Sequence, residues 1–222
     1  MALDTFHHAE LDKSASEIRL VRFSPRENDT EIISCELRSF NLNDKSCPPY
    51  RALSYEWGAE SPVCPILVNG YSLNVRQNLH HYLEQVECKR YAESWVWIDQ
   101  ISINQADIAE RNHQVQQMGT IFRKATMVIA WIGLADVHSD RAASAVSRLD
   151  LCKEICEAEA KAAVATLLTV ERLSVLYILQ RSYFRRLWIV QEILLAKEVT
   201  VACGHARIPW RDIRHVAKFL GP

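Results

Sequence analysis

Alternating apolar and polar positions divide the beginning of the chain into short strand-like segments. Residues 16–23 (SEIRLVRF) and 31–40 (EIISCELRSF) show this alternation and are separated by a turn-rich stretch. The pattern predicts an N-terminal β-hairpin. A second small β unit is predicted at 65–75, where Asn69-Gly70 is a strong two-residue turn signal.

Buried strands and helices are predicted to alternate between residues 50 and 133. Three apolar runs have the length of buried strands: 50–58 (YRALSYEWG), 94–103 (SWVWIDQISI) and 127–133 (MVIAWIG). Apolar residues recur at helical spacing in 76–90, and again in the segment after Asn104 and Asp107, either of which can cap that helix. This order predicts an α/β fold with a mostly parallel sheet that is flanked by helices on both faces.

The remainder of the chain is predicted to be largely helical. Residues 141–181 are rich in Ala and Leu and indicate two helices, 182–196 indicates a further helix, and 199–204 (VTVACG) indicates a last strand. Residues 1–15 form a polar leader without an apolar signal region.

Composition excludes several classes of function. The 26 basic and 27 acidic residues nearly cancel, so we expect no nucleic-acid partner. The strongest apolar run, 125–135, is too short to span a bilayer, so we expect a soluble, cytoplasmic protein. The seven cysteines include no CxxC pair and no zinc-ligand set, so no metal is expected. The six glycines form neither GxGxxG nor a Walker loop, which argues against a Rossmann or P-loop site.

Three segments stand out along the chain: YRALSYEWG (50–58), WVWIDQISINQADIAERNHQVQQMGTIFRKATMVIAWIG (95–133) and FRRLWIVQE (184–192). Together they resemble the fungal heterokaryon-incompatibility (HET) domain. One departure is Ser102, where the family's second motif usually carries a cysteine. The resemblance implies a single HET domain over 16–222, with its core motifs in 50–204, as the N-terminal part of a longer protein. It also implies a role in self/non-self recognition, in which activation of the domain kills the cell.

The HET family is thought to be a distant relative of TIR domains, so the resemblance implies a TIR-like (flavodoxin-like) sheet with the N-terminal hairpin added. ALSYEW is similar to the first TIR strand, and WIDQ is similar to the second. LWIVQE resembles the TIR segment in which a tryptophan precedes a glutamate by four residues. In the TIR enzymes that cleave NAD this glutamate is catalytic, which implies a catalytic role for Glu192. NAD would then be a substrate, and no cofactor is expected.

The chemistry of NAD cleavage suits one well-placed carboxylate. Loss of nicotinamide passes through an oxocarbenium-like state and needs no general acid, because the leaving group is already cationic. On a continuous helix, Trp188 and Glu192 share a face, so the indole could stack on a ring while the carboxylate faces the ribose. Arg185 would lie on that face and could pair with Glu192 or with a phosphate. The alternative is an ordinary exposed Glu–Arg pair beside a half-buried tryptophan.

Four further residues are candidates for substrate binding at the ends of two predicted strands. Asp99 follows a strand, where ligand crevices open in parallel sheets, and could bind a ribose hydroxyl. An N-cap or turn aspartate explains it equally well. Ser54, Tyr55 and Trp57 could line the same crevice, although Trp57 with Gly58 is as readily a packed corner.

The other motif residues are interpreted as structural. Asn104, Gln105 and Glu110 fit a capped loop, and Arg186 is expected to anchor the last helix to this loop by an ion pair with Asp99 or Glu110.

Two functions remain open from the sequence. One is an NAD glycohydrolase, which we favour slightly. The other is a non-catalytic death-signalling module that acts by self-assembly and recruitment. Both imply a homo-oligomer on activation and an upstream activator that the sequence does not identify.

Overall fold

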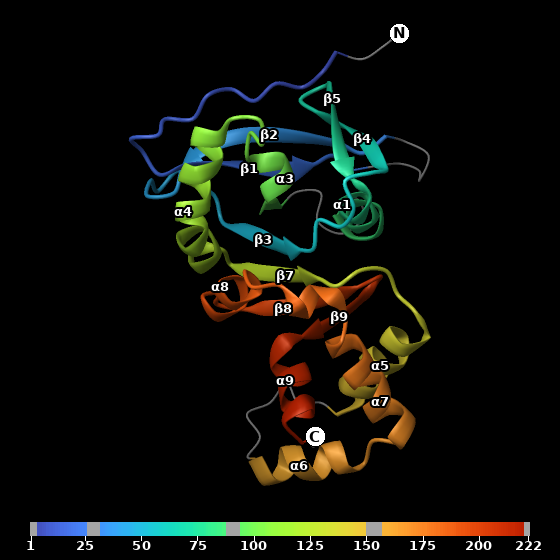
Figure 1. Cartoon of the computed structure of the whole chain (residues 1–222). Coiled ribbons are helices and arrows are strands. Elements are labelled where there is room, and N and C mark those ends of the chain that lie inside the picture. The colour runs from blue at the N-terminus through green and yellow to red at the C-terminus, as the bar shows by residue number, and fades with distance from the viewer. Residues whose placement is uncertain (1–3, 26–31, 88–93, 150–156, 220–222) are drawn as a thin grey trace.

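The computed structural model describes residues 4–25, 32–87, 94–149 and 157–219. These residues form one mixed sheet with helices around it (Figure 1). The α/β class is therefore confirmed.

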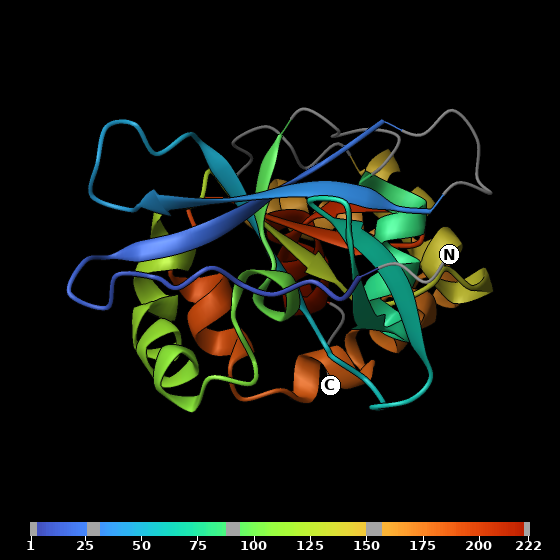
Figure 2. The same cartoon turned by 90° about the horizontal axis from the view of Figure 1, so that it is seen from above.

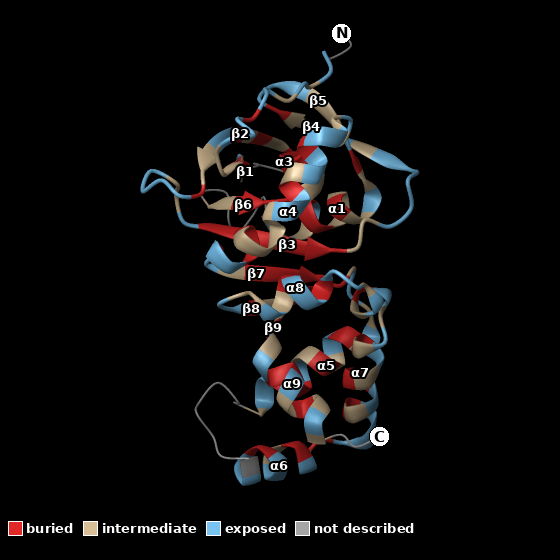
Figure 3. Ribbon diagram, turned by 60° about the vertical axis from the view of Figure 1, so that its left-hand side comes forward, coloured by how far each residue is buried: buried red, intermediate tan, exposed pale blue. Residues whose placement is uncertain are grey.

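The centre of the sheet consists of four parallel strands. These are β6 (Trp95–Trp97), β3 (Tyr50–Tyr55), β7 (Met127–Trp131) and β8 (Val199–Cys203), in that spatial order. Every residue of β3 is buried, as is all of β7 except Met127, and both strands are largely red in Figure 3. Such continuously buried strands are typical of parallel sheets that are covered on both faces.

Antiparallel hairpins extend this centre on both sides. On one side, β1 (Glu17–Phe23) pairs with β6 and with β2 (Ser34–Asn41), which confirms the N-terminal hairpin. Beyond it lies the predicted second hairpin, β4 (Val63–Val68) and β5 (Tyr71–Arg76). On the other side, β9 (Ala206–Pro209) pairs antiparallel with β8.

The expectation of a mostly parallel sheet is thus wrong for the sheet as a whole. The described strands follow the order β5-β4-β2-β1-β6-β3-β7-β8-β9, and only the centre and the β2–β4 contact are parallel. The turn between β4 and β5 explains one antiparallel ladder, because Asn69 (φ 51°) and Gly70 (φ 86°) both adopt the left-handed conformation that a tight hairpin needs.

Helices cover the two faces unequally. One face carries α1 (Gln77–Tyr82), which continues as a π-helical turn over Leu83–Glu87, and α3 (Asp99–Ser102). The other core cluster contains residues of the remaining described helices: α4 (Ile108–Lys124), α5 (Val137–Arg148), α6 (Glu157–Ala165), α7 (Thr169–Leu179), α8 (Ile189–Leu194) and α9 (Trp210–Phe219). A 3-10 turn, η2 (Ser182–Arg185), precedes α8.

Three predicted elements have different bounds. The predicted strand 94–103 ends at Trp97, because Ile98 and Ile101 pack at helical spacing through α3. The predicted helix 182–196 is broken at Arg186, whose backbone is extended (φ −74°, ψ 136°). The region 141–181 contains parts of three helices rather than two, and residues 150–156 within it lie outside the described ranges.

The segment before β1 packs on the domain. Phe6 donates its backbone N–H to Ser72, and a ring nitrogen of His8 lies 2.8 Å from the Ile101 carbonyl. Figure 2 shows this segment crossing the molecule beside β5 and α3. In the parts of the chain that are described, no single helix is long and apolar enough to cross a membrane, and α6 with α7 passes that test only as a pair bent by 110°.

Candidate functional site

The three motif segments meet at the carboxyl end of the central strands. β3 and β6 run parallel with Ala52 opposite Trp97, so the residues that follow them emerge at the same edge of the sheet. The segment η2–α8 brings Tyr183, Arg186 and Glu192 to this edge, where Glu192 contacts Ser54 at the end of β3.

Glu192 is buried and held by two side chains, those of Arg186 and Ser54. Its carboxylate is in a forked pair with Arg186, with Nη1–Oε2 and Nη2–Oε1 distances of 3.3 Å, and the residue is only 2% exposed. The Ser54 hydroxyl donates to Oε2 of Glu192. The hydroxyls of Ser54 and Tyr183 lie 2.6 Å apart. Since a hydroxyl has one proton, Tyr183 donates to Ser54 when Ser54 donates to Glu192.

Burial changes the acidity of Tyr183. Desolvation raises the pKa of its hydroxyl far above the ordinary value, and the negative charge of Glu192 raises it further. Tyr183 is therefore a fixed proton donor at neutral pH, and the arrangement Tyr183–Ser54–Glu192–Arg186 satisfies both carboxylate oxygens.

Asp99 forms the second half of the site. The Trp57 indole Nε1 donates to Oδ2 at 2.7 Å, and the backbone N–H of Gln100 donates to Oδ1 at 2.7 Å. Burial raises the pKa of Asp99 to about 6, although these hydrogen bonds oppose the shift, and the charge of Glu192 also raises it. The two carboxylates are thus close enough to repel each other.

Tyr55 lies between the two halves. Its hydroxyl is buried and, among the described residues, has no hydrogen bond of acceptable geometry. It nevertheless lies close enough to Asp99 and Arg186 for both to act on its pKa, which burial raises well above the ordinary value. The Tyr55 hydroxyl thus lies against the Asp99 carboxylate, and this contact acts to lower the pKa of Asp99.

Two predicted site residues are not brought into this cluster. The backbone N–H of Glu192 bonds to the Trp188 carbonyl, yet Trp188 is 51% exposed while Glu192 is buried. The two residues are thus one helical turn apart, as predicted, but the indole is half-exposed whereas the carboxylate is buried. Arg185 is exposed. Because the helix is broken at Arg186, the guanidinium of Arg186, and not that of Arg185, pairs with Glu192.

The predicted structural motif is tied to the sheet through a residue that the sequence did not single out. Glu110 accepts from Arg19 at 2.7 and 3.0 Å and from the backbone N–H of Asn104 at 2.7 Å. Burial acts to raise the pKa of Glu110, but these bonds hold it below its ordinary value. The predicted ion pair of Arg186 with Asp99 or Glu110 is wrong, because Arg186 pairs with Glu192.

The remaining loop contacts are local. Gln105 Nε2 donates to the Asp99 carbonyl at 3.0 Å, and Asp107 rather than Asn104 caps α4. The sequence gives only a weak signal for Arg19 and Tyr183, since each is a polar group inside an apolar segment. Within the described ranges, no three His, Cys, Asp or Glu side chains are grouped to hold a metal ion.

Comparisons with known proteins agree with the arrangement of these motifs. A family model described as "Heterokaryon incompatibility protein (HET)" matches residues 50–192, the span that runs from β3 to Glu192. Heterokaryon incompatibility protein 6, OR allele, of Neurospora crassa is 26% identical over 257 residues, which cover 98% of this chain and 38% of that protein. The chain therefore spans well under half the length of this relative. No solved structure matches the chain significantly.

Proposed function

Because the chain belongs to the heterokaryon-incompatibility (HET) family, we propose that it is a cytoplasmic effector domain that triggers cell death in self/non-self recognition. The family match and the name of the Neurospora crassa relative support a role in heterokaryon incompatibility. The upstream activator and the self-association that this role implies are part of the proposal.

We further propose that the domain hydrolyses NAD to nicotinamide and ADP-ribose, as TIR-type enzymes do. The observation that carries this proposal is the pair of acidic groups, Glu192 and Asp99, at the carboxyl end of β3 and β6. The C–N bond breaks with its electron pair going to nicotinamide, and the Glu192 carboxylate stabilises the cationic ribose. Water then adds to the sugar carbon, and its proton passes to Asp99, whose pKa of about 6 suits a base near neutral pH.

The described conformation holds this site closed. Glu192 is 2% exposed, and Ser54 and Arg186 occupy its carboxylate oxygens. A substrate therefore requires α8 to move away from β3. Self-association of the domain is the step that we propose opens the site.

The test measures NAD loss and nicotinamide release by the concentrated protein, alone and fused to a tetramer-forming helix. We expect turnover in the clustered wild type, and a loss of about 100-fold or more in Glu192→Gln, which removes the charge and keeps the shape. Glu198→Gln is the matched control, since Glu198 is an exposed glutamate shortly after α8. A folded Glu192→Gln protein with an undiminished rate, or a clustered wild type without turnover, would refute catalysis.

A non-catalytic assembly module is the second candidate, and it has its own observation. Leu187, Val190 and Leu194 are 89%, 55% and 76% exposed around α8, beside the half-exposed Trp188. With Gly119 and Leu195 this surface borders a hollow of about 630 Å³ against α4. Exposed apolar groups gathered on one element are typical of a protein contact surface.

A further inference from the structure

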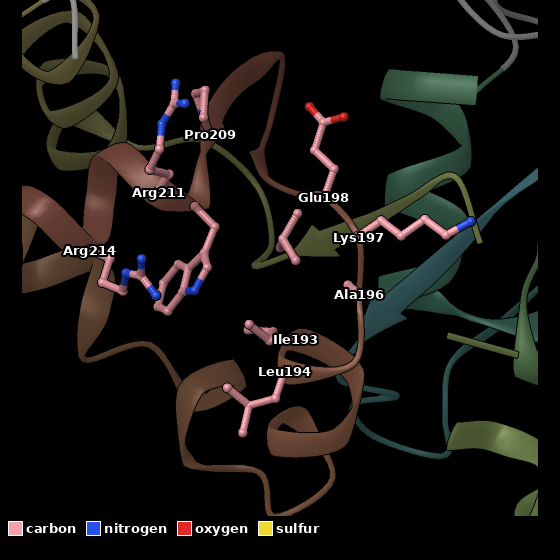
Figure 4. Close-up of a pocket in the computed structure, with 10 residues that line it drawn as sticks. Ile193, Leu194, Ala196, Lys197, Glu198, Pro209, Arg211 and Arg214 are labelled. Carbon is pink, nitrogen blue, oxygen red and sulfur yellow. The ribbon is translucent and has the colours of Figure 1, made fainter. Parts of the chain in front are cut away.

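A cavity of about 710 Å³ opens between the end of α8, the connection to β8 and the start of α9 (Figure 4). Its volume lies within the range of about 300–1,000 Å³ that is usual for small-molecule sites. Polar and apolar atoms contribute about equally to its wall, and the apolar residues that line it are Ile193, Leu194, Ala196, Val199, Pro209 and Trp210.

The charged residues around this cavity are mainly basic. Arg211 and Arg214, three residues apart on α9, extend from one side, whereas the Lys197 side chain extends toward the other (Figure 4). Glu198 is the one acidic residue among the described residues that line it. Among the described residues Arg214 has no hydrogen-bond or ion-pair partner, and Arg211 contacts only its neighbour Asp212, at 3.3 Å. The guanidinium of Arg214 is thus available to an anion. The exposed side chain of Arg211, which extends in another direction in Figure 4, lies on the same helix face and can turn to join it.

Trp210 adds a flat aromatic wall to the cavity. Its ring stacks on Phe184, with centroids 5.8 Å apart and an interplanar angle of 20°. The indole is therefore already ordered, and a ligand that packs against it loses little side-chain entropy in doing so. Such a wall favours a planar, apolar ligand body.

We propose that this cavity binds a small organic anion with a planar ring. The anionic group pairs with Arg211 and Arg214, and the ring packs against Trp210 and Leu194. Glu192 does not line this cavity, whose arginines and Trp210 lie on α9. The site therefore goes beyond the proposed function and does not depend on it. Because Ile193 and Leu194 belong to α8, an occupant also stabilises that short helix.

Titration calorimetry with three probes tests the two halves of the site. The probes are 1-naphthyl phosphate, 1-naphthol, which has the ring alone, and inorganic phosphate, which has the charge alone. We expect naphthyl phosphate to bind at least about tenfold more tightly than either fragment, since ring and anion are held together. Added salt weakens this binding, because the arginines are exposed to solvent.

Variants assign the binding to this cavity. Arg211→Gln with Arg214→Gln is expected to weaken naphthyl phosphate about tenfold, and Trp210→Leu also weakens it. The control is Arg111→Gln with Arg123→Gln, which removes the same charge from the exposed surface of α4. Hydrogen exchange of the wild type gives an independent measurement, with slower exchange expected in α8 and α9 when the probe is bound.

Three results would overturn the proposal. One is that naphthyl phosphate fails to bind at millimolar concentration. Another is that inorganic phosphate alone binds as tightly as naphthyl phosphate. The third is that the α4 control weakens binding as much as the α9 double variant.

Discussion

At the scale of one residue, the buried carboxylate of Asp99 lowers the stability of the folded protein when it is charged. Burial raises its pKa from 3.8 to about 6, so the native state binds a proton that the unfolded chain releases. The stability that this proton supplies is fully present below pH 3.8 and is lost as the pH rises through about 6. At neutral pH the charged carboxylate is therefore held at a cost, as is common in functional sites.

Asp99→Asn removes this titration and keeps an acceptor oxygen for the Trp57 indole. Between pH 5 and pH 7 the wild type is expected to lose about 1 kcal/mol more unfolding free energy than the variant. Urea unfolding at the two pH values measures the difference. Asp4→Asn, at an exposed position, is the control and should follow the wild type. If Asp99→Asn and the wild type showed the same pH dependence of unfolding free energy, the raised pKa of Asp99 would be contradicted.

The sequence located most residues of the site but not their pairings. Ser54 and Asp99 were identified because each lies at the end of a predicted strand, and parallel strands bring such ends together. Glu192 was identified because its segment resembles the TIR motif, and it contacts Ser54. The partner of Arg186 was missed because the pairing depends on a single extended backbone position inside an apparently continuous helical pattern. Periodicity gives no signal for such a break.

At the scale of the element, α8 combines a buried acid with an exposed apolar surface. Its six residues direct Glu192 inward, while Val190 and Leu194 face solvent beside Leu187. A helix this short has little intrinsic stability and depends on its tertiary contacts. A partner bound to its outer surface is thus well placed to move Glu192.

Leu187→Ser with Leu194→Ser tests this surface. We expect cell killing to be lost while thermal stability stays within about 0.5 kcal/mol of the wild type, because both side chains are exposed. Killing is scored by viability after expression in fungal cells, and stability by thermal unfolding. Val170→Ser with Leu173→Ser, at 44% and 58% exposed positions on α7, is the matched control. Wild-type killing by the α8 variant would exclude a role for its outer surface.

At the scale of the whole molecule, the sheet is a parallel centre with a hairpin extension on each side. The sequence predicted the strands individually, because alternation and apolar runs are local signals. The mixed order depends on which strands meet across long separations, such as β1 with β6 and β2 with β4, and no local pattern encodes those contacts.

The connection from β7 to α5 also packs on the β8–β9 turn, and Gly204 makes this contact possible. A Cβ at Gly204 would lie 2.5 Å from the Cβ and 3.0 Å from the backbone N of Ala135, and its φ of 52° is already left-handed. Gly204→Ala is therefore expected to lower the unfolding free energy by about 3 kcal/mol, through backbone strain and overpacking. Denaturant unfolding measures the loss. Gly70→Ala has the same strain (φ 86°) but nothing within 4 Å, so it should lose only about 1 kcal/mol. Equal losses in the two variants would show that backbone strain alone, and not the contact with Ala135, governs Gly204.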